Sequence, residues 1–83
     1  MPIRVKVLYF AQAREAAGMV EEDISLPNRS SVKTLVRLST RAHFKLEKIS
    51  AVMRVAVNEE VAREEDRLEE GDIVAFMPPV AGG

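Results

Sequence analysis

The chain contains no cysteine, and this absence removes several structural and chemical options at once. No disulfide can cross-link the fold and no thiolate can bind a metal, so an apolar core must hold the 83 residues together. With 83 residues, 47% of them hydrophobic, the chain can form one such core. The protein also lacks a side-chain thiol nucleophile.

Histidine, glycine and long apolar runs are also scarce. The only histidine, His43, excludes a multi-histidine metal site, and its place near the apolar side of a helical wheel favours a partly buried structural role. The four glycines form no phosphate-binding loop. No stretch approaches the roughly 20 apolar residues of a membrane-spanning helix, and the first residues alternate rather than form a signal-peptide core. We therefore expect a cytoplasmic protein.

Charge is nearly balanced in total but is separated along the chain. The formal net charge of −1 disfavours general nucleic-acid binding. Residues 25–58 carry a charge of +6 and residues 59–83 carry −6. The simplest interpretation is a helix with a basic outer face followed by acidic loops, although such a surface can also orient a partner. The acids from Glu64 to Asp72 match no calcium loop, so we expect a solvated loop and no metal site.

Hydrophobic periodicity predicts short strands and two helices. Period-two alternation predicts strands over 3–10 and 53–58, with a short segment around Val61. Residues 20–26, whose apolar positions are at mixed spacing before a turn, and the unbroken apolar run 73–77 are also expected to be strands. Residues 11–17 are good helix formers and stop at Gly18. Ser30 or Ser31 can cap a longer helix that extends to His43. Its predicted apolar face comprises Val32, Leu35, Val36, Ser39 and Ala42.

This order of elements predicts an α+β fold in which the long helix covers one face of a mixed sheet. We expect one domain over residues 1–77 and an extended tail over residues 78–83. In the tail, Pro78 and Pro79 favour an extended path, and six extended residues span roughly 20 Å. Gly82 and Gly83 have no side chains and could enter a narrow channel. Taken alone, the glycines fit a delivery arm and a frayed end about equally.

Three further segments decide between these two interpretations. The opening Val7-Leu8-Tyr9-Phe10-Ala11-Gln12-Ala13-Arg14-Glu15, the segment Val55-Ala56-Val57-Asn58 and the segment Gly71-Asp72-Ile73-Val74-Ala75-Phe76 precede the ending Pro78-Pro79-Val80-Ala81-Gly82-Gly83. In this order, and at this chain length, they resemble the small subunits of molybdopterin synthase. The segment from Ser31 to Ala51 is not diagnostic.

The resemblance implies a ubiquitin-like β-grasp fold and a sulfur-carrier function. An ATP-dependent, E1-like activating enzyme would adenylate the Gly83 carboxylate, and sulfur would replace AMP to give a thiocarboxylate. Gly83, next to Gly82, would then deliver sulfur to cyclic pyranopterin monophosphate in molybdenum cofactor biosynthesis. The catalytic side chains would belong to the large subunit, so this chain is not expected to be an enzyme on its own, nor to bind a cofactor or metal. A heterotetramer of two small and two large subunits is implied.

Strand parity predicts the docking surface for these partners. If Ile3, Val5 and Val7 face the helix, then Leu8 and Phe10 lie on the outer face of the sheet, and an exposed apolar patch of this kind usually marks an interface. By resemblance, the partner-binding positions are Phe10, Val61 and Met77, followed by the tail residues Pro78, Pro79, Val80 and Ala81. Met77 departs from the Phe that is common in the family at this position.

Three alternative functions remain open from the sequence. A related carrier could feed the thiazole of thiamine, although such carriers are typically shorter and lack the segment from Phe10 to Gly18. A ubiquitin-like modifier could join its activated carboxylate to protein lysines. An inert β-grasp interaction domain would use no tail chemistry.

Overall fold

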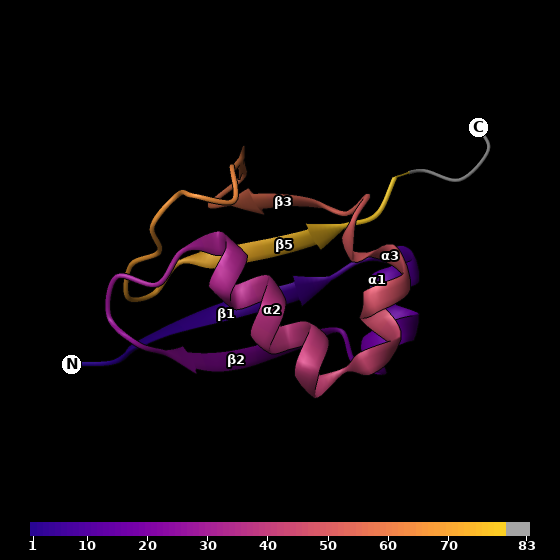
Figure 1. The fold of residues 1–83 in the computed structure, drawn as a ribbon, viewed down its shortest axis with the longest axis horizontal. Helices are drawn as coiled ribbons and strands as arrows, with labels where there is room; N and C mark the ends of the chain where they lie inside the picture. Colours follow the sequence, from indigo (N-terminus) through magenta and orange to yellow (C-terminus); the bar gives the residue numbers. More distant parts are fainter. Residues whose placement is uncertain (80–83) are drawn as a thin grey trace.

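The computed structural model describes residues 1–79 and contains a mixed five-stranded sheet with helices against one face (Figure 1). The strands are β1 (Ile3–Tyr9), β2 (Glu21–Leu26), β3 (Arg54–Val57), β4 (Glu60–Val61) and β5 (Ile73–Met77). Their order across the sheet is β2-β1-β5-β3-β4. β1 and β5 pair in parallel, whereas the other neighbouring strands pair antiparallel. The last strand therefore lies in the middle of the sheet.

The helices begin and end where local chemistry requires it. α1 (Ala11–Ala17) ends at Gly18, whose φ of 75° is a left-handed conformation that glycine adopts without a Cβ clash. α2 (Val32–Ala42) starts at Ser31, whose side chain accepts a hydrogen bond from the Thr34 backbone N–H. The predicted helices are confirmed.

Two loop positions also take left-handed backbone angles. Asn58 and Glu59 have φ values of 51° and 72°, the pattern of the two-residue turn that joins β3 to β4. This turn leads into β4, the short segment that was predicted around Val61.

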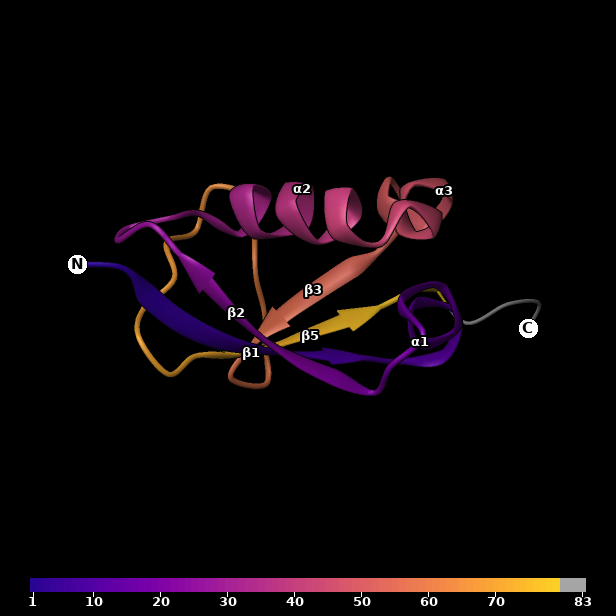
Figure 2. The same ribbon diagram turned by 90° about the horizontal axis from the view of Figure 1, so that it is seen from below.

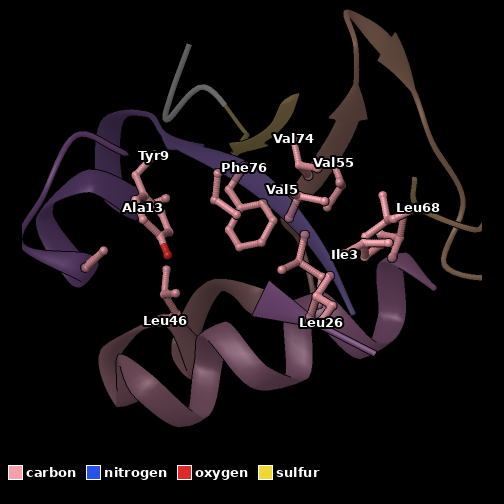
Figure 3. Close-up of a cluster of buried hydrophobic side chains, with 14 residues drawn as sticks. Ile3, Val5, Tyr9, Ala13, Leu26, Leu46, Val55, Leu68, Val74 and Phe76 are labelled. Atoms are coloured by element: carbon pink, nitrogen blue, oxygen red, sulfur yellow. The ribbon is translucent and has the colours of Figure 1, made fainter. Parts of the chain in front are cut away.

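The core lies between the sheet and the layer of helices, as Figure 2 shows from below. α2 and the short helix α3 (Glu47–Ser50) cover one face, and α1 lies at the end toward which β1 and β5 run. Side chains from β1, β5 and α2 meet there, and Figure 3 shows the Phe76 ring between Tyr9 and Val5. The fully buried members with the largest side chains are Tyr9, Phe76, Leu26, Leu35 and Leu46. The predicted parity of β1 is confirmed.

Three details differ from the sequence-based prediction. Residues after His43 form a 3-10 turn, η1 (Phe44–Leu46), and then α3, where no element was predicted. They form because Leu46 is drawn fully into the core while its neighbours stay exposed. Ala42, predicted on the apolar face, is exposed because the chain leaves the helix at His43. Val20 lies outside β2 and is exposed, because β2 starts at Glu21.

Within residues 1–79, no helix is long and apolar enough to cross a membrane.

Candidate functional site: the outer face of the sheet

The face of the sheet that the helices leave uncovered carries a row of apolar side chains. Strand register aligns Leu8 of β1 with Ala75 of β5, and Ala75 with Ala56 of β3. Ala56 in turn pairs with Val61 of the edge strand. Leu8 and Ala75 alternate with buried neighbours along their strands, so they lie on the outer face. Cross-strand pairing puts Ala56 and Val61 on the same face, although Ala56 is only 6% exposed. The row continues at one end with Phe10 and Met77.

We call this surface the outer-face patch and define it by its partly or fully exposed members Leu8, Phe10, Val61, Ile73, Ala75 and Met77. Phe10 is 40% exposed, Ile73 46% and Val61 73%. Large apolar side chains at this exposure, gathered on one face of a small protein, mark an interaction surface. Phe10, Val61 and Met77, predicted as partner-binding positions, therefore belong to one apolar surface. Their role in binding remains a prediction.

Sequence analysis missed two members of this patch, Ile73 and Ala75. Both belong to the unbroken apolar run of the last strand, which was read only as a strand. The burial pattern of that strand alternates between its two faces, so every second residue points outward. This alternation was the signal that could have found them.

Charged side chains border the patch on the β2 side. Lys6 Nζ lies 3.2 Å from Glu21 Oε2 across the β1–β2 pair. The hydrogen bond and charge of Glu21, aided by Asp23, raise the pKa of the Lys6 ammonium above its ordinary value. Both side chains are about half exposed, so solvent screens this pair and it adds little to stability. The patch thus has an apolar centre and a charged rim, as protein interfaces commonly have.

The end of β5 places the start of the C-terminal tail at the margin of this patch. β5 lies between β1 and β3, and the Phe10 backbone N–H donates a 3.2 Å hydrogen bond to the Phe76 carbonyl oxygen. Pro78 is buried and Pro79 is exposed, so the chain emerges beside Phe10 and Met77. Pro78 was predicted to contact partners, and that role stays a prediction. Val80, Ala81, Gly82 and Gly83 lie outside the described residues.

His43 has the structural role that its position predicted. His43 Nε2 lies 2.8 Å from Glu22 Oε1, and the Tyr9 hydroxyl donates a 2.9 Å hydrogen bond to the same oxygen. The Tyr9 and His43 rings meet edge to face with centroids 5.7 Å apart. Burial, followed by the hydrogen bond and charge of Glu22, raises the pKa of Tyr9 well above its ordinary range. This cluster ties β1 and β2 to the end of α2.

The acidic segment forms a solvated loop, as predicted. Within residues 1–79, no three histidine or carboxylate side chains gather closely enough to hold a metal ion. Its carboxylates stabilise local turns: Asp66 accepts a hydrogen bond from the Arg63 backbone N–H, and Asp72 accepts one from that of Glu69. Asn58 joins the β3–β4 turn to the same region by donating to Asp72.

Comparison with protein families agrees with this geometry. The model of the ThiS family matches residues 7–83. A molybdopterin synthase sulfur carrier subunit from Chlamydomonas reinhardtii is 36% identical over 83 residues, covering 98% of this chain and 100% of the relative. The protein of the same name from Mycobacterium tuberculosis is 37% identical, covering 98% of this chain and 99% of the relative.

Solved structures show the same fold. A Pyrococcus furiosus protein provisionally named molybdopterin converting factor subunit 1 superposes with a TM-score of 0.86 at 34% identity, covering 94% of this chain and 99% of that one. SAMP1 from Haloferax volcanii gives 0.85 at 26% identity, covering 96% and 99%. One chain of the complex of subunits 1 and 2 of the molybdopterin-converting factor from Helicobacter pylori gives 0.69 at 23% identity, covering 98% and 100%.

The ubiquitin-like β-grasp fold that the resemblance implied is thereby confirmed. The match extends through the outer face of the sheet and the Gly-Gly ending, which are the two features of the chain that suggest a function. The chain belongs to the ThiS family, and its full-length relatives place it among the molybdopterin synthase sulfur carrier subunits.

Proposed function

We propose that this protein carries sulfur on its main-chain terminus as the small subunit of a molybdopterin synthase. The observation that supports this most directly is the position of β5, whose end releases the tail at the margin of an exposed apolar patch. A partner that covers the patch would receive the tail at a fixed place. Residues 1–77 would then act as the recognition domain and residues 78–83 as the arm.

The chemistry requires activation, because a carboxylate is a poor electrophile. An oxygen of the Gly83 carboxylate attacks the α-phosphate of ATP on an E1-like activating enzyme, which forms an acyl adenylate and releases pyrophosphate. A sulfur nucleophile supplied through that enzyme then attacks the acyl carbon and displaces AMP. If the nucleophile is hydrosulfide, loss of its proton leaves a Gly83 thiocarboxylate; if it is a persulfide, a thiol reductant must then cleave the S–S bond of the acyl disulfide to give the same product. ATP is a substrate of the activating enzyme in this scheme, so this chain needs no resident cofactor.

We propose that the large subunit of molybdopterin synthase is the partner that receives the tail. The Helicobacter pylori structure contains subunits 1 and 2 together, which is the precedent for this pairing. We propose that Phe10, Val61 and Met77 dock on the large subunit while Pro79, Val80 and Ala81 lead Gly82 and Gly83 into its active site. Cyclic pyranopterin monophosphate would accept the sulfur there. Two copies of each subunit would form a cytoplasmic heterotetramer.

A protein-modifier function is the second candidate, because SAMP1, the Haloferax volcanii small archaeal modifier protein 1, has nearly the same fold at 26% identity. The two functions share the acyl adenylate and differ in the nucleophile that attacks it. A sulfur carrier yields a free thiocarboxylate, whereas a modifier yields an amide bond to a lysine of another protein. The product of activation therefore distinguishes them.

Intact-mass measurement after incubation with activating enzyme, ATP and a sulfur donor tests the proposal. Sulfur should replace one carboxyl oxygen because the adenylate is an activated electrophile, and the mass should rise by about 16 Da, the difference between the two atomic masses. An unchanged mass together with new, heavier conjugates would support the modifier function instead.

Changes to the terminus provide the matched variants. Deleting Gly83, adding one residue after it, or making Gly82→Ile should abolish sulfur transfer, because the reacting carbon is lost, displaced or obstructed by a β-branched side chain. One residue added before Met1, which is fully exposed, is the control and should leave transfer unchanged. Molybdopterin formation by a chain that lacks both glycines would refute the carrier mechanism.

A further inference from the structure

A second surface feature lies on the helix side of the sheet and meets the outer-face patch at Val61. It is a groove of about 860 Å³ between α2, η1 and α3 on one side and the β3–β4 hairpin on the other. Its apolar lining includes Val32, Val36, Phe44, Met53 and Val55. The groove runs along the length of α2, and nothing in the proposed sulfur chemistry uses it.

Phe44 is the most unusual residue of this groove. It is 74% exposed although Leu46, two residues later in the same 3-10 turn, is fully buried. A turn this short cannot direct both side chains inward, so burying Leu46 leaves the Phe44 ring in solvent. An exposed aromatic ring beside an apolar groove is a typical anchor for a binding partner.

Cations without acidic partners line the same groove. Lys33, Arg37 and Arg41 follow one another at intervals of four residues along α2, about 6 Å apart, and Arg54 lies on the opposite wall. The salt bridges within residues 1–79 join Lys6 to Glu21 and His43 to Glu22, so none involves these four side chains. Glu47 and Glu64 are the acids of the lining, so the groove keeps a basic excess. A ligand with acidic groups would meet this charge.

The geometry favours a helix as the occupant. Carboxylates one helical turn apart repeat at about the same 6 Å interval as the three α2 cations. An added β-strand is disfavoured, because the adjacent edge strand β4 has only two residues to pair with it. A second copy of this chain is also disfavoured: α1 and α3 each contain one acid and α2 contains none.

We propose that this groove binds an acidic amphipathic helix of another protein, with apolar residues against Val36, Phe44 and Met53 and carboxylates against Lys33, Arg37 and Arg41. The site does not depend on the sulfur chemistry of the tail. The groove and the outer-face patch share Val61 at the sheet edge, whereas the α2 wall of the groove and the Phe10 end of the patch are separate. One protein could therefore hold the α2 wall while another covers the Phe10 end of the patch and receives the tail.

A synthetic peptide tests this directly. The probe is a fluorescent helical peptide about four turns long, with leucines along one face and glutamates flanking them; the same composition in scrambled order is the control peptide. Fluorescence anisotropy with the full-length protein should give a micromolar Kd for the amphipathic peptide, weakened by added salt. Amide chemical shifts should change at residues 32–44 and 53–55 and not at Leu8, Phe10 and Met77, the part of the outer face away from the groove.

Two groove variants and one control variant test whether the peptide binds in the groove. Phe44→Asp and the double change Arg37→Glu with Arg41→Glu should each weaken peptide binding by at least about tenfold, because they remove the anchor and reverse the complementary charge. All three side chains are exposed, so the fold should persist, and circular dichroism checks this. Phe10→Asp, on the opposite face, is the matched control and should bind the peptide normally.

Equal binding of both peptides, unchanged affinity in the groove variants, or no binding at all would overturn the proposal. Self-association in sedimentation experiments that Phe44→Asp abolishes and the peptide does not compete with would also overturn it, and would assign the groove to a second copy. A failure here leaves the sulfur-transfer experiments untouched, because those depend on the tail.

Discussion

The two faces of the sheet begin with similar apolar side chains and end in different environments. On the inner face, Val5, Val7 and Tyr9 of β1 are almost completely buried under the helices. On the outer face, Leu8 and Phe10 of the same segment remain partly exposed. The difference comes from the cover, because α2 and α3 pack against one face only. Apolar residues thus stabilise the fold on one face and are available for association on the other.

Neighbouring residues of β5 give the largest expected contrast between the faces. Phe76→Ala should lower the free energy of unfolding by about 3–5 kcal/mol, because Phe76 is fully buried and packs edge to face on Tyr9. Met77→Ala, on the other face, should lower the free energy of unfolding by less than about half as much, since Met77 stays partly exposed. Urea unfolding of both variants measures this, and equal losses would mean that the outer face is as closely packed as the inner one.

Substitutions on the outer face should weaken partner binding, whereas substitutions on the inner face should lower stability. Phe10→Asp should weaken association with a molybdopterin synthase large subunit by on the order of 2 kcal/mol, because it places a charge in a desolvated contact. The fold should tolerate the change, since Phe10 occupies the N-cap position of α1, which aspartate favours. Isothermal titration with Phe10→Asp and Met77→Asp tests this. Unchanged affinity in both variants would place the interface elsewhere.

Tyr9→Phe probes the only hydroxyl that the inner face contributes from β1. Loss of the hydrogen bond to Glu22 should cost about 1 kcal/mol near neutral pH. The folded state raises the pKa of Tyr9 above its ordinary 10.0, so it keeps a proton that the unfolded chain releases. The stability that this group provides is therefore present below pH 10 and is lost as the pH rises above 10.

Two measurements check this pH dependence. The stability difference between Tyr9→Phe and the unchanged protein should shrink in urea unfolding about one unit above the ordinary tyrosine pKa. Because Tyr9 is the only tyrosine, its phenolate absorbance reports the titration without interference. A midpoint near the ordinary value in the folded protein would contradict the role of Glu22 and burial.

The smallest effect is expected at the rim of the outer-face patch. Lys6→Gln removes the ion pair with Glu21, which solvent already screens, so the urea midpoint should not change measurably. The association rate with the large subunit should still respond, because rim charges steer encounter more than they hold the complex. Stopped-flow binding at low and high salt separates the two effects. A clear loss of stability would show that the pair is less screened than its exposure indicates.

Local chemistry made much of this protein readable from its sequence. Alternation gave β1 and its inner face, Gly18 ended α1, Ser31 capped α2, and the acidic segment was solvated as its spacing indicated. The tail residues that suggest the function were also evident, because their chemistry depends on residue type rather than on neighbours in space.

Only the tertiary structure decided what depends on packing between distant segments. It drew Leu46 into the core and so created η1 and the exposed Phe44, which no local pattern predicted. It buried Pro78, exposed Ala42, and aligned Leu8, Ala75 and Ala56 across three strands. These outcomes depend on which surfaces the helices cover, and the sequence of a single segment does not show which of its faces another segment will bury.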